Sequence, residues 1–349
     1  MSRSTMQLSP HQWSAAAVLA VALAAMGTAH AGYEAAGTTA ANFLSLGAGA
    51  RALGMAGAAL GVGDELGGVA WNAAAAGWLS RSELVLSHAG LANRSLQEWG
   101  AIGGPIARSQ TRWAVTALYQ GDGSFDGRDA TGASTGSFSV SSVALGATLA
   151  RQLGSRVSLG FGATAVRERI ATVTGSGHTF DGGLMVRAGM FGFGFAAQNV
   201  GGQMRYGASR YPFPGAWGVG IGFTPRGSAV RVACDVNFPN AYHPDIRAGV
   251  EWTHRDAMAL RAGYRKELDS IADPLSGPSF GLGVRQGGMW MDYGYLLSAN
   301  GAGQHRMGLR FNFGRSGPND GPLGHVGAPK GPDAGRDASR AGLPPPPGP

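Results

Sequence analysis

The sequence predicts an all-β protein, a transmembrane antiparallel β-barrel of about fourteen strands with an N-terminal plug, or hatch. Apolar and polar residues alternate along much of the chain, as they do in strands that have one face in an apolar environment. Glycine is frequent, at 60 of 349 residues, and only 14% of the residues are charged. Ordinary soluble domains carry about 25% charged residues. The N-terminus also has the pattern of a secretory signal, which would direct the mature chain beyond the inner membrane.

Residues 1–31 fit the three regions of a signal peptide. Arg3 supplies the positive charge, residues 15–26 form a short apolar run, and Ala29–Ala31 fits the small-residue cleavage motif. The apolar run is too short to cross a bilayer as a helix, which takes about 20 residues. The alternative is a hydrophobic N-terminal helix of a cytoplasmic protein, which accounts for fewer of these features.

Residues 32–80 differ from the rest of the chain, because they are rich in alanine and glycine and lack a period of two. Small side chains let backbone segments approach closely. A compact plug inside a barrel requires this, and so would a tightly packed helical hairpin in a soluble domain. We predict that these residues form the plug. The run GAGARA loosely matches a dinucleotide-binding fingerprint, but it follows no predicted strand and lies in no βαβ unit.

Residues 49–79 resemble the N-terminal hallmark of the PorV/PorQ family, within the FadL-type outer-membrane transport proteins. That hallmark reads approximately G-A-R-A-x-G-M-G-G-A, followed by an acidic residue and then by W-N-P-A-G-L. The positions that match are Gly49, Ala50, Arg51, Ala52, Gly54, Met55, Gly57, Ala58, Asp64, Trp71 and Asn72. Ala56 replaces a glycine and Ala73 replaces the proline, so the turn after Asn72 lacks the fixed φ angle that proline would give it.

The resemblance implies a barrel of about fourteen strands in the cell outer membrane, with Arg51, Asp64 and Asn72 as candidate residues of the plug. FadL-type proteins carry hydrophobic compounds such as long-chain fatty acids across the outer membrane. PorV-type proteins belong to the type IX secretion machinery and hold secreted protein cargo. A structural barrel is the third alternative. The expected partners are therefore outer-membrane lipid and either a hydrophobic small molecule or a secreted protein, and we expect a monomer.

Residues 81–313 are predicted to form the barrel. An even number of strands is what bacterial barrels require, and segments of about 9–11 residues suit a tilted crossing of the membrane. The connections 121–135, 200–215 and 267–278 are expected to be long external loops. The predicted strands are Glu83–Gly90, Gln97–Pro105, Thr111–Gln120, Gly136–Ala150, Arg156–Ile170, His178–Ala188, Met190–Asn199, Ala216–Thr224, Ala229–Phe238, Asp245–Thr253, Ala257–Arg265, Ser279–Arg285, Met289–Leu297 and His305–Phe313.

The alternation is clearest over residues 230–238, where Val232, Cys234 and Val236 fall on one face and Arg231 and Asp235 on the other. In a soluble sheet the apolar face would be the core, whereas in a membrane barrel it faces lipid and the polar face lines the lumen. Composition and the signal peptide favour the barrel. Aromatic residues near predicted strand ends fit an interfacial girdle. They are Trp99, Trp113, Trp217, Trp252 and Tyr264.

The predicted lumenal face carries several arginines together with acidic residues such as Glu251 and Asp292. Two interpretations are open. The arginines bind the carboxylate headgroup of a ligand bidentately while its apolar tail lies along the plug, or they form ion pairs that fill the lumen and position the plug. The candidate ligand or lumen residues are Arg231, Arg247, Arg261, Arg285 and Arg310.

The sequence offers no nucleophile–base set and no histidine or cysteine spacing for a metal, so we expect neither an enzyme nor a cofactor. No cluster of basic residues with interleaved aromatics suggests nucleic acid. Cys234 is the single cysteine, which excludes an intrachain disulfide. Residues 314–349 are dense in proline and glycine and are predicted to form a disordered tail.

Overall fold

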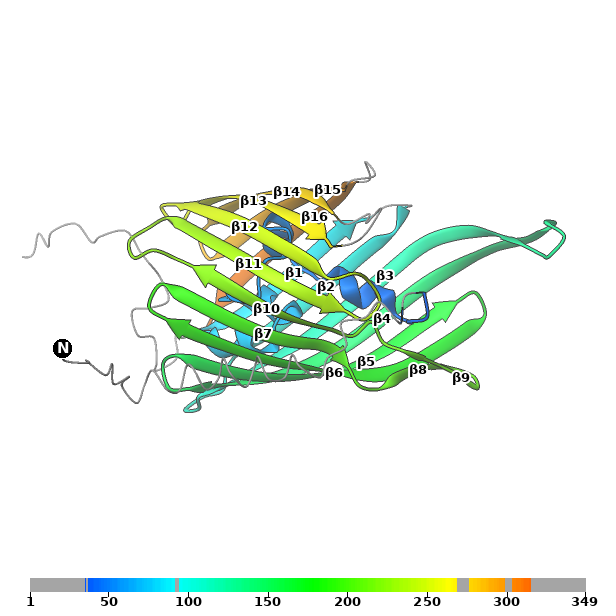
Figure 1. Cartoon of the computed structure of the whole chain (residues 1–349), viewed down its shortest axis with the longest axis horizontal. Coiled ribbons are helices and arrows are strands. Elements are labelled where there is room, and N and C mark those ends of the chain that lie inside the picture. The colour runs from blue at the N-terminus through cyan, green and yellow to red at the C-terminus, as the bar shows by residue number, and fades with distance from the viewer. Residues whose placement is uncertain (1–34, 36, 92–93, 269–275, 299–302, 315–349) are drawn as a thin grey trace, which may run out of the picture.

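In the computed structural model, one antiparallel β-sheet of sixteen strands dominates the chain, and fourteen of these strands close into a barrel (Figure 1). The structure describes residue 35 and residues 37–91, 94–268, 276–298 and 303–314. The expected signal peptide and nearly all of the expected tail lie outside these residues. The predicted fold class and strand number are confirmed.

The sheet closes because the first and last strands pair with each other, and because β5 also pairs with β6. The other two strands, β8 (Gln203–Tyr206) and β9 (Ser209–Pro212), form a hairpin that extends the sheet from β6. The barrel strands are β1 (Ser82–Gly90), β2 (Leu96–Pro105), β3 (Thr111–Arg128), β4 (Ser134–Leu153), β5 (Val157–Ile170), β6 (Val173–Ala188), β7 (Phe191–Val200), β10 (Ala216–Phe223), β11 (Val230–Pro239), β12 (Asp245–His254), β13 (Met258–Glu267), β14 (Gly277–Gln286), β15 (Met289–Leu297) and β16 (Gly303–Phe313).

The connections at one end of the barrel are short turns, such as 189–190 and 287–288, and we call this the short-turn end. Two predicted loops at the opposite, long-loop end contain strands. Residues 121–128 and 134–135 extend β3 and β4 into a hairpin that projects beyond the barrel (Figure 1). Residues 203–212 form the β8–β9 hairpin. Serine, threonine and glycine are frequent in the first stretch, and arginine and tyrosine interrupt the second. Neither stretch therefore shows the apolar alternation that predicts the other strands.

The predicted facing of the strands is confirmed on β11, where Val232 is 43% exposed on the outer face and Asp235 is 1% exposed inside. Trp99 corrects the predicted girdle. It points into the barrel and is 7% exposed, because its position on β2 has the same parity as the inward-facing Gln97 and Ala101. The small side chains of Ala48 and Ala76 lie in the same cluster and leave room for the indole.

Residues 37–81, which we call the N-terminal segment, lie inside the barrel (Figure 1). Their helical turns contact different sides of the wall: α2 (Ala50–Gly54) contacts β13 to β16, η3 (Leu66–Ala70) contacts β1 and β2, and η4 (Ala73–Trp78) contacts β3 to β6. A further turn, η2 (Asn42–Leu46), precedes them. Among the described residues, every helix is too short to span a membrane. The segment therefore crosses the lumen from one wall to the other.

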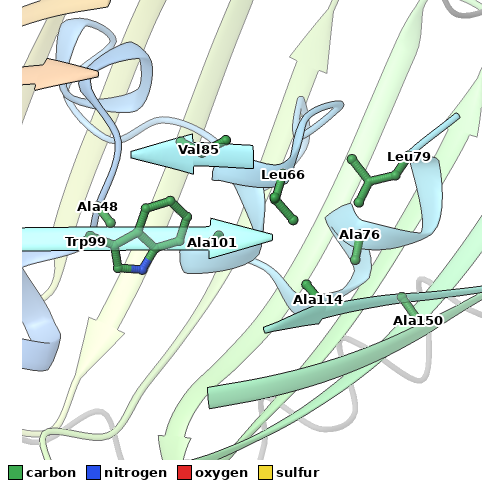
Figure 2. Close-up of a cluster of buried hydrophobic side chains, with 9 residues drawn as sticks. All are labelled: Ala48, Leu66, Ala76, Leu79, Val85, Trp99, Ala101, Ala114 and Ala150. Carbon is green, nitrogen blue, oxygen red and sulfur yellow. The ribbon is translucent and has the colours of Figure 1, made fainter. Parts of the chain in front are cut away.

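Apolar contacts and close backbone approach hold the segment against the wall. Figure 2 shows one cluster, in which Leu66 and Leu79 of the segment pack with Val85 of β1 and Trp99 of β2. Elsewhere the wall needs glycine, because a Cβ atom at Gly249 would lie 2.7 Å from the backbone oxygen of Met55. Where large outward residues alternate with glycine along a strand of the wall, the backbone of the N-terminal segment therefore occupies the interior beside the glycines.

Candidate functional site

The centre of the barrel holds an ion-pair network that joins the N-terminal segment to the wall. Arg51 lies at its middle, 16% exposed, with Nη1 2.8 Å from both Asp64 and Glu65 of the same segment. The Nε and Nη2 atoms of Arg51 each donate to Glu251 of β12 at 2.7 Å. This is the bidentate geometry in which arginine binds a carboxylate most strongly.

Three wall arginines complete this network. Arg231 lies 2.8 Å from Asp64, and Arg310 pairs with Glu65. Arg261 bridges Glu251 and Asp292, each at 2.7 Å. Four arginines therefore face four carboxylates. We call these eight residues the central ion-pair network: Arg51, Asp64, Glu65, Arg231, Glu251, Arg261, Asp292 and Arg310.

The two acidic residues of the segment remain ionised in this environment. Burial alone would raise the pKa of Asp64, but attraction to Arg231 and Arg51 outweighs it and holds the pKa well below its usual value. Burial opposes ionisation of Glu65 in the same way, and Arg310 and Arg51 lower its pKa. Each of the four arginines of the network has a carboxylate partner.

Polar wall side chains also satisfy backbone groups of the segment, which lie in no regular ladder of their own. Asp235 of β11 accepts from the amides of Ala59 and Leu60 at 2.7 and 2.9 Å. Glu83 of β1 accepts from the amide of Leu66 at 2.8 Å. The sequence placed Asp235 on the lumenal face without giving it this role, and Glu83 was not singled out. Their inward parity is the signal that could have identified both.

Asn72 fastens the segment to a different part of the wall. Its Nδ2 atom lies 3.3 Å from the carbonyl oxygens of Leu60, Leu184 and Phe195, the last two on β6 and β7. Its Oδ1 atom accepts from the amide of Ala74 at 3.0 Å and so caps η4. Alanine at position 73 is compatible with this turn, because the asparagine side chain itself fixes the start of η4.

Arg247 lies outside the central ion-pair network, in the lining of a small pocket that is partly open to solvent. Its Nε atom contacts Asp245 at 2.6 Å, and its guanidinium lies 5.4 Å from the ring centre of Trp71. Arg265 contacts the same aspartate at 3.1 Å. Leu46, Leu53 and Leu296 supply apolar lining. We call this the arginine-lined pocket, and it has apolar and cationic walls together.

Arg285 does not join the other predicted arginines. It lies at the end of β14 beside the short turn, where it pairs with Asp256 and donates to the carbonyl oxygen of Gly287 at 3.1 Å. The position has the parity of the lumenal face, but it lies near the short-turn end, away from the acidic residues of the segment. The structure therefore brings together Arg231, Arg261 and Arg310 and places Arg247 in the pocket.

Arg306 of β16 is a buried cation that the sequence analysis did not select. It is 1% exposed and donates to Gln97 at 3.0 Å. Among the described residues it has no carboxylate partner, and its Nε and Nη1 atoms lack hydrogen-bond partners. Gln97 in turn donates to the carbonyl oxygen of Phe43 in η2 at 3.4 Å. The described part of the chain contains no cluster of histidine, cysteine or acidic residues suited to a metal ion.

No family model matches the sequence, and no curated protein matches it. Solved structures do share the fold. The toluene transporter TbuX of Ralstonia pickettii has a TM-score of 0.58 at 12% identity, over 77% of this chain and 99% of that one. A FadL homologue of Pseudomonas aeruginosa has a TM-score of 0.53 at 10% identity, over 77% and 99%.

The monoaromatic hydrocarbon channel CymD gives a TM-score of 0.53 at 12% identity, over 77% of this chain and 98% of that one. At such identities the likeness shows the fold alone. This chain therefore has the closed antiparallel barrel of the FadL-type channels, with a polar network at its centre.

Proposed function

We propose that the protein is an outer-membrane channel for hydrophobic small molecules, with FadL-like transport as its activity. The observation that carries the proposal is a barrel whose lumen is crossed by a wall-anchored segment, with a pocket of apolar and cationic lining beside it. The outward faces of the strands are apolar, as lipid requires. The shared fold with a toluene transporter and a hydrocarbon channel supports the same class of cargo.

In this proposal the N-terminal segment, which covers most of the predicted residues 32–80, is the plug. The central ion-pair network and the hydrogen bonds that Asp235 and Glu83 accept from backbone amides hold the plug closed. Transport then requires a rearrangement that leaves the barrel intact, because the wall has its own continuous backbone pairing. Of the two interpretations of the lumenal arginines, the ion-pair network accounts for Arg231, Arg261 and Arg310.

The arginine-lined pocket is the proposed ligand site. A transport path should be continuous with apolar residues of the plug, and Leu46 and Leu53 line this pocket. Leu44 packs instead against a separate apolar cluster that includes Phe213 and Met204. Transport of a hydrophobic compound would begin at this pocket.

A pocket-filling variant tests the proposal. Ser45→Trp places an indole in the lining of the arginine-lined pocket, and Thr131→Trp places the same group in an exposed turn as the matched control. Uptake of labelled toluene and of a labelled long-chain fatty acid is measured in cells that express each variant. We expect Ser45→Trp to reduce uptake at least fivefold and the control to leave it unchanged. Equal uptake in both variants would contradict the assigned pocket.

A second variant tests the uptake of fatty acids separately from the uptake of toluene. Among the described residues, Arg306 is a buried cation without an acidic partner, and it is available to a carboxylate ligand. Arg306→Met should reduce fatty-acid uptake and leave toluene uptake unchanged, since only the first molecule carries a charge. The variant leaves no carboxylate of the described residues without its cation, so it should not destabilise the barrel. A parallel loss of both substrates would indicate a structural role for Arg306.

The PorV-type role in protein secretion stays an alternative that comes from the motif at residues 49–79. Gentle extraction of the full chain from its own membrane, followed by native mass spectrometry, separates the alternatives. A retained apolar small molecule supports the transport proposal. A retained protein partner with an empty lumen would favour the secretion role. The same spectra report the oligomeric state, for which we propose a monomer.

A further inference from the structure

The outer face of the barrel carries a row of arginines at the long-loop end of β5, β6, β8 and β9. Arg167 of β5 pairs in register with Ser176 of β6, which pairs with Arg205 of β8, which pairs with Arg210 of β9. Residues opposite each other in register project to the same face of a sheet. All four side chains are exposed. We call this set the outer arginine row.

The row faces outward and not into the lumen. On β8, Met204 is fully buried whereas Arg205 is exposed. On β5, Val166 is 3% exposed and packs inside the barrel with Met204, whereas the adjacent Arg167 is exposed. Alternate residues of a strand point to opposite faces. Arg167 and Arg205 therefore continue the lipid-facing surface of the wall.

The height of the row along the wall can be worked out from β5. The outward positions from Val157 to Ala165 are apolar, and Arg167 lies ten residues beyond Val157. Ten residues span about 33 Å along a strand, or about 25 Å of height at the tilt of about 40° that such barrels have. The apolar band of an outer-membrane barrel is about 25 Å tall. Arg167 therefore lies where the apolar band ends and lipid headgroups begin.

The row has a charge that the protein does not neutralise. Arg205 and Arg210 are directly opposite each other, an arrangement in which like charges destabilise strand pairing. Among the described residues, none of Arg167, Arg205 and Arg210 pairs with a carboxylate. Elsewhere near this end of the barrel, the outward Glu98 is paired with His88 at 2.5 Å. The outer arginine row is thus a site at which an anion would relieve repulsion.

We propose that the outer arginine row binds the phosphate groups of a glycolipid in the outer leaflet of the membrane. Guanidinium groups bind phosphate bidentately, and Ser176 supplies a hydroxyl between Arg167 and Arg205. The apolar wall directly below, including the stacked rings of Phe161 and Phe180, accepts the acyl chains of the same molecule. A headgroup with phosphates and acyl chains matches both parts of this surface, whereas a free phosphate matches only one. The inference rests on the proposed outer-membrane location.

The test uses the full-length protein in phospholipid nanodiscs and titrates it with purified lipid A, followed by native mass spectrometry. The variant Arg205→Ala/Arg210→Ala removes the like-charge pair, and Lys266→Ala removes an outward-facing cation of β13 as the matched control. We expect at least a tenfold loss of lipid A affinity in the double variant and no change in the control. Equal affinity in all three proteins would overturn the proposal.

Two further arms identify what is bound. Lipid A without phosphates should bind at least tenfold more weakly than the phosphorylated form, and inorganic phosphate at 10 mM should not displace the lipid. Binding that is independent of the lipid phosphates, or that is abolished by inorganic phosphate, would overturn a glycolipid headgroup site. The variant Arg210→Glu guards against misfolding, because it replaces a like-charge pair by an opposite-charge pair across the strands. It should lose lipid A while the barrel stays folded.

Failure of this inference is distinguishable from failure of the proposed function. Uptake of toluene is measured in vesicles of phospholipid alone, where the glycolipid is absent. Cell fractionation reports the location independently of both. A protein found in the outer membrane that transports toluene but binds lipid A without the arginines would refute the outer arginine row alone.

Discussion

Replacing Arg51 by methionine should loosen the N-terminal segment while the barrel stays folded. Arg51 donates twice to Glu251 at 2.7 Å and reaches Asp64 and Glu65 at 2.8 Å. Its removal deprives the buried Glu251 and the half-buried Asp64 and Glu65 of one cation each. Every one of them nevertheless keeps another arginine of the central ion-pair network. The backbone pairing of the wall does not involve Arg51, so only the closed position of the segment is weakened.

The expected magnitude follows from these contacts. Removing one partner of a buried ion pair typically costs about 3–5 kcal/mol. Because each carboxylate keeps a second arginine, we expect the lower end of this range. Since about 1.4 kcal/mol corresponds to a factor of ten in an equilibrium constant, a cost of about 3 kcal/mol raises the fraction of molecules with a displaced segment by about two orders of magnitude.

Ion current through single proteins in a planar bilayer measures this displacement directly, and protease digestion of the segment measures it independently. Arg51→Met should conduct without substrate and should be cut within residues 37–81, and Arg51→Glu should show a larger effect. Arg285→Met removes an arginine of the short-turn rim and should behave like the unmodified protein. A folded Arg51→Met barrel that stays closed and protease-resistant would refute the role assigned to this arginine.

Three other outcomes are expected. Val232→Arg puts a charge on the lipid face of β11. It should lower the free energy of unfolding in lipid by about 2–4 kcal/mol. An unchanged unfolding midpoint would mean that Val232 does not face lipid. Gly249→Val should open the channel, because even a Cβ atom at this position would lie 2.7 Å from the backbone oxygen of Met55. The control Ala248→Val, on the outer face, should leave the channel closed. Identical ion currents in the two variants would exclude close packing of the segment against Gly249. The third concerns pH. The pKa values of Asp64 and Glu65 are lowered in the folded state, so their stabilisation is complete above about pH 4 and is lost as the pH falls further. The contribution of Asp64 and Glu65 to closure should therefore be the same at pH 8 and pH 5 and should be lost only in stronger acid. The difference in leak current between the unmodified protein and Asp64→Asn/Glu65→Gln measures this contribution, and a difference that shrinks near neutrality would contradict the stated pKa directions.

The wall of the barrel was largely predictable because its signal is local. A residue on a strand and the residue two positions on share a face, so Val232 and Asp235 could be assigned to lipid and lumen from the sequence alone. Trp99 shows the limit of this reasoning. Its parity on β2 is that of Gln97 and Ala101, so parity predicts an inward side chain where proximity to a strand end predicts a girdle position. The glycine- and serine-rich parts of β3 and β4 lack this signal, because they project beyond the barrel and need no apolar face.

The pairing of the central ion-pair network was not predictable, because a period of two fixes the face of a residue and not its height in the barrel. Height depends on strand tilt and on the stagger of the register around the barrel. Arg261 and Arg285 both have lumenal parity, yet Arg261 reaches Glu251 while Arg285 pairs with Asp256 at the rim. Arg51 and Glu251 are 200 residues apart and meet only because the segment folds back into the closed barrel. The sequence therefore supplies the list of charges, and closure of the barrel around the segment decides which of them meet.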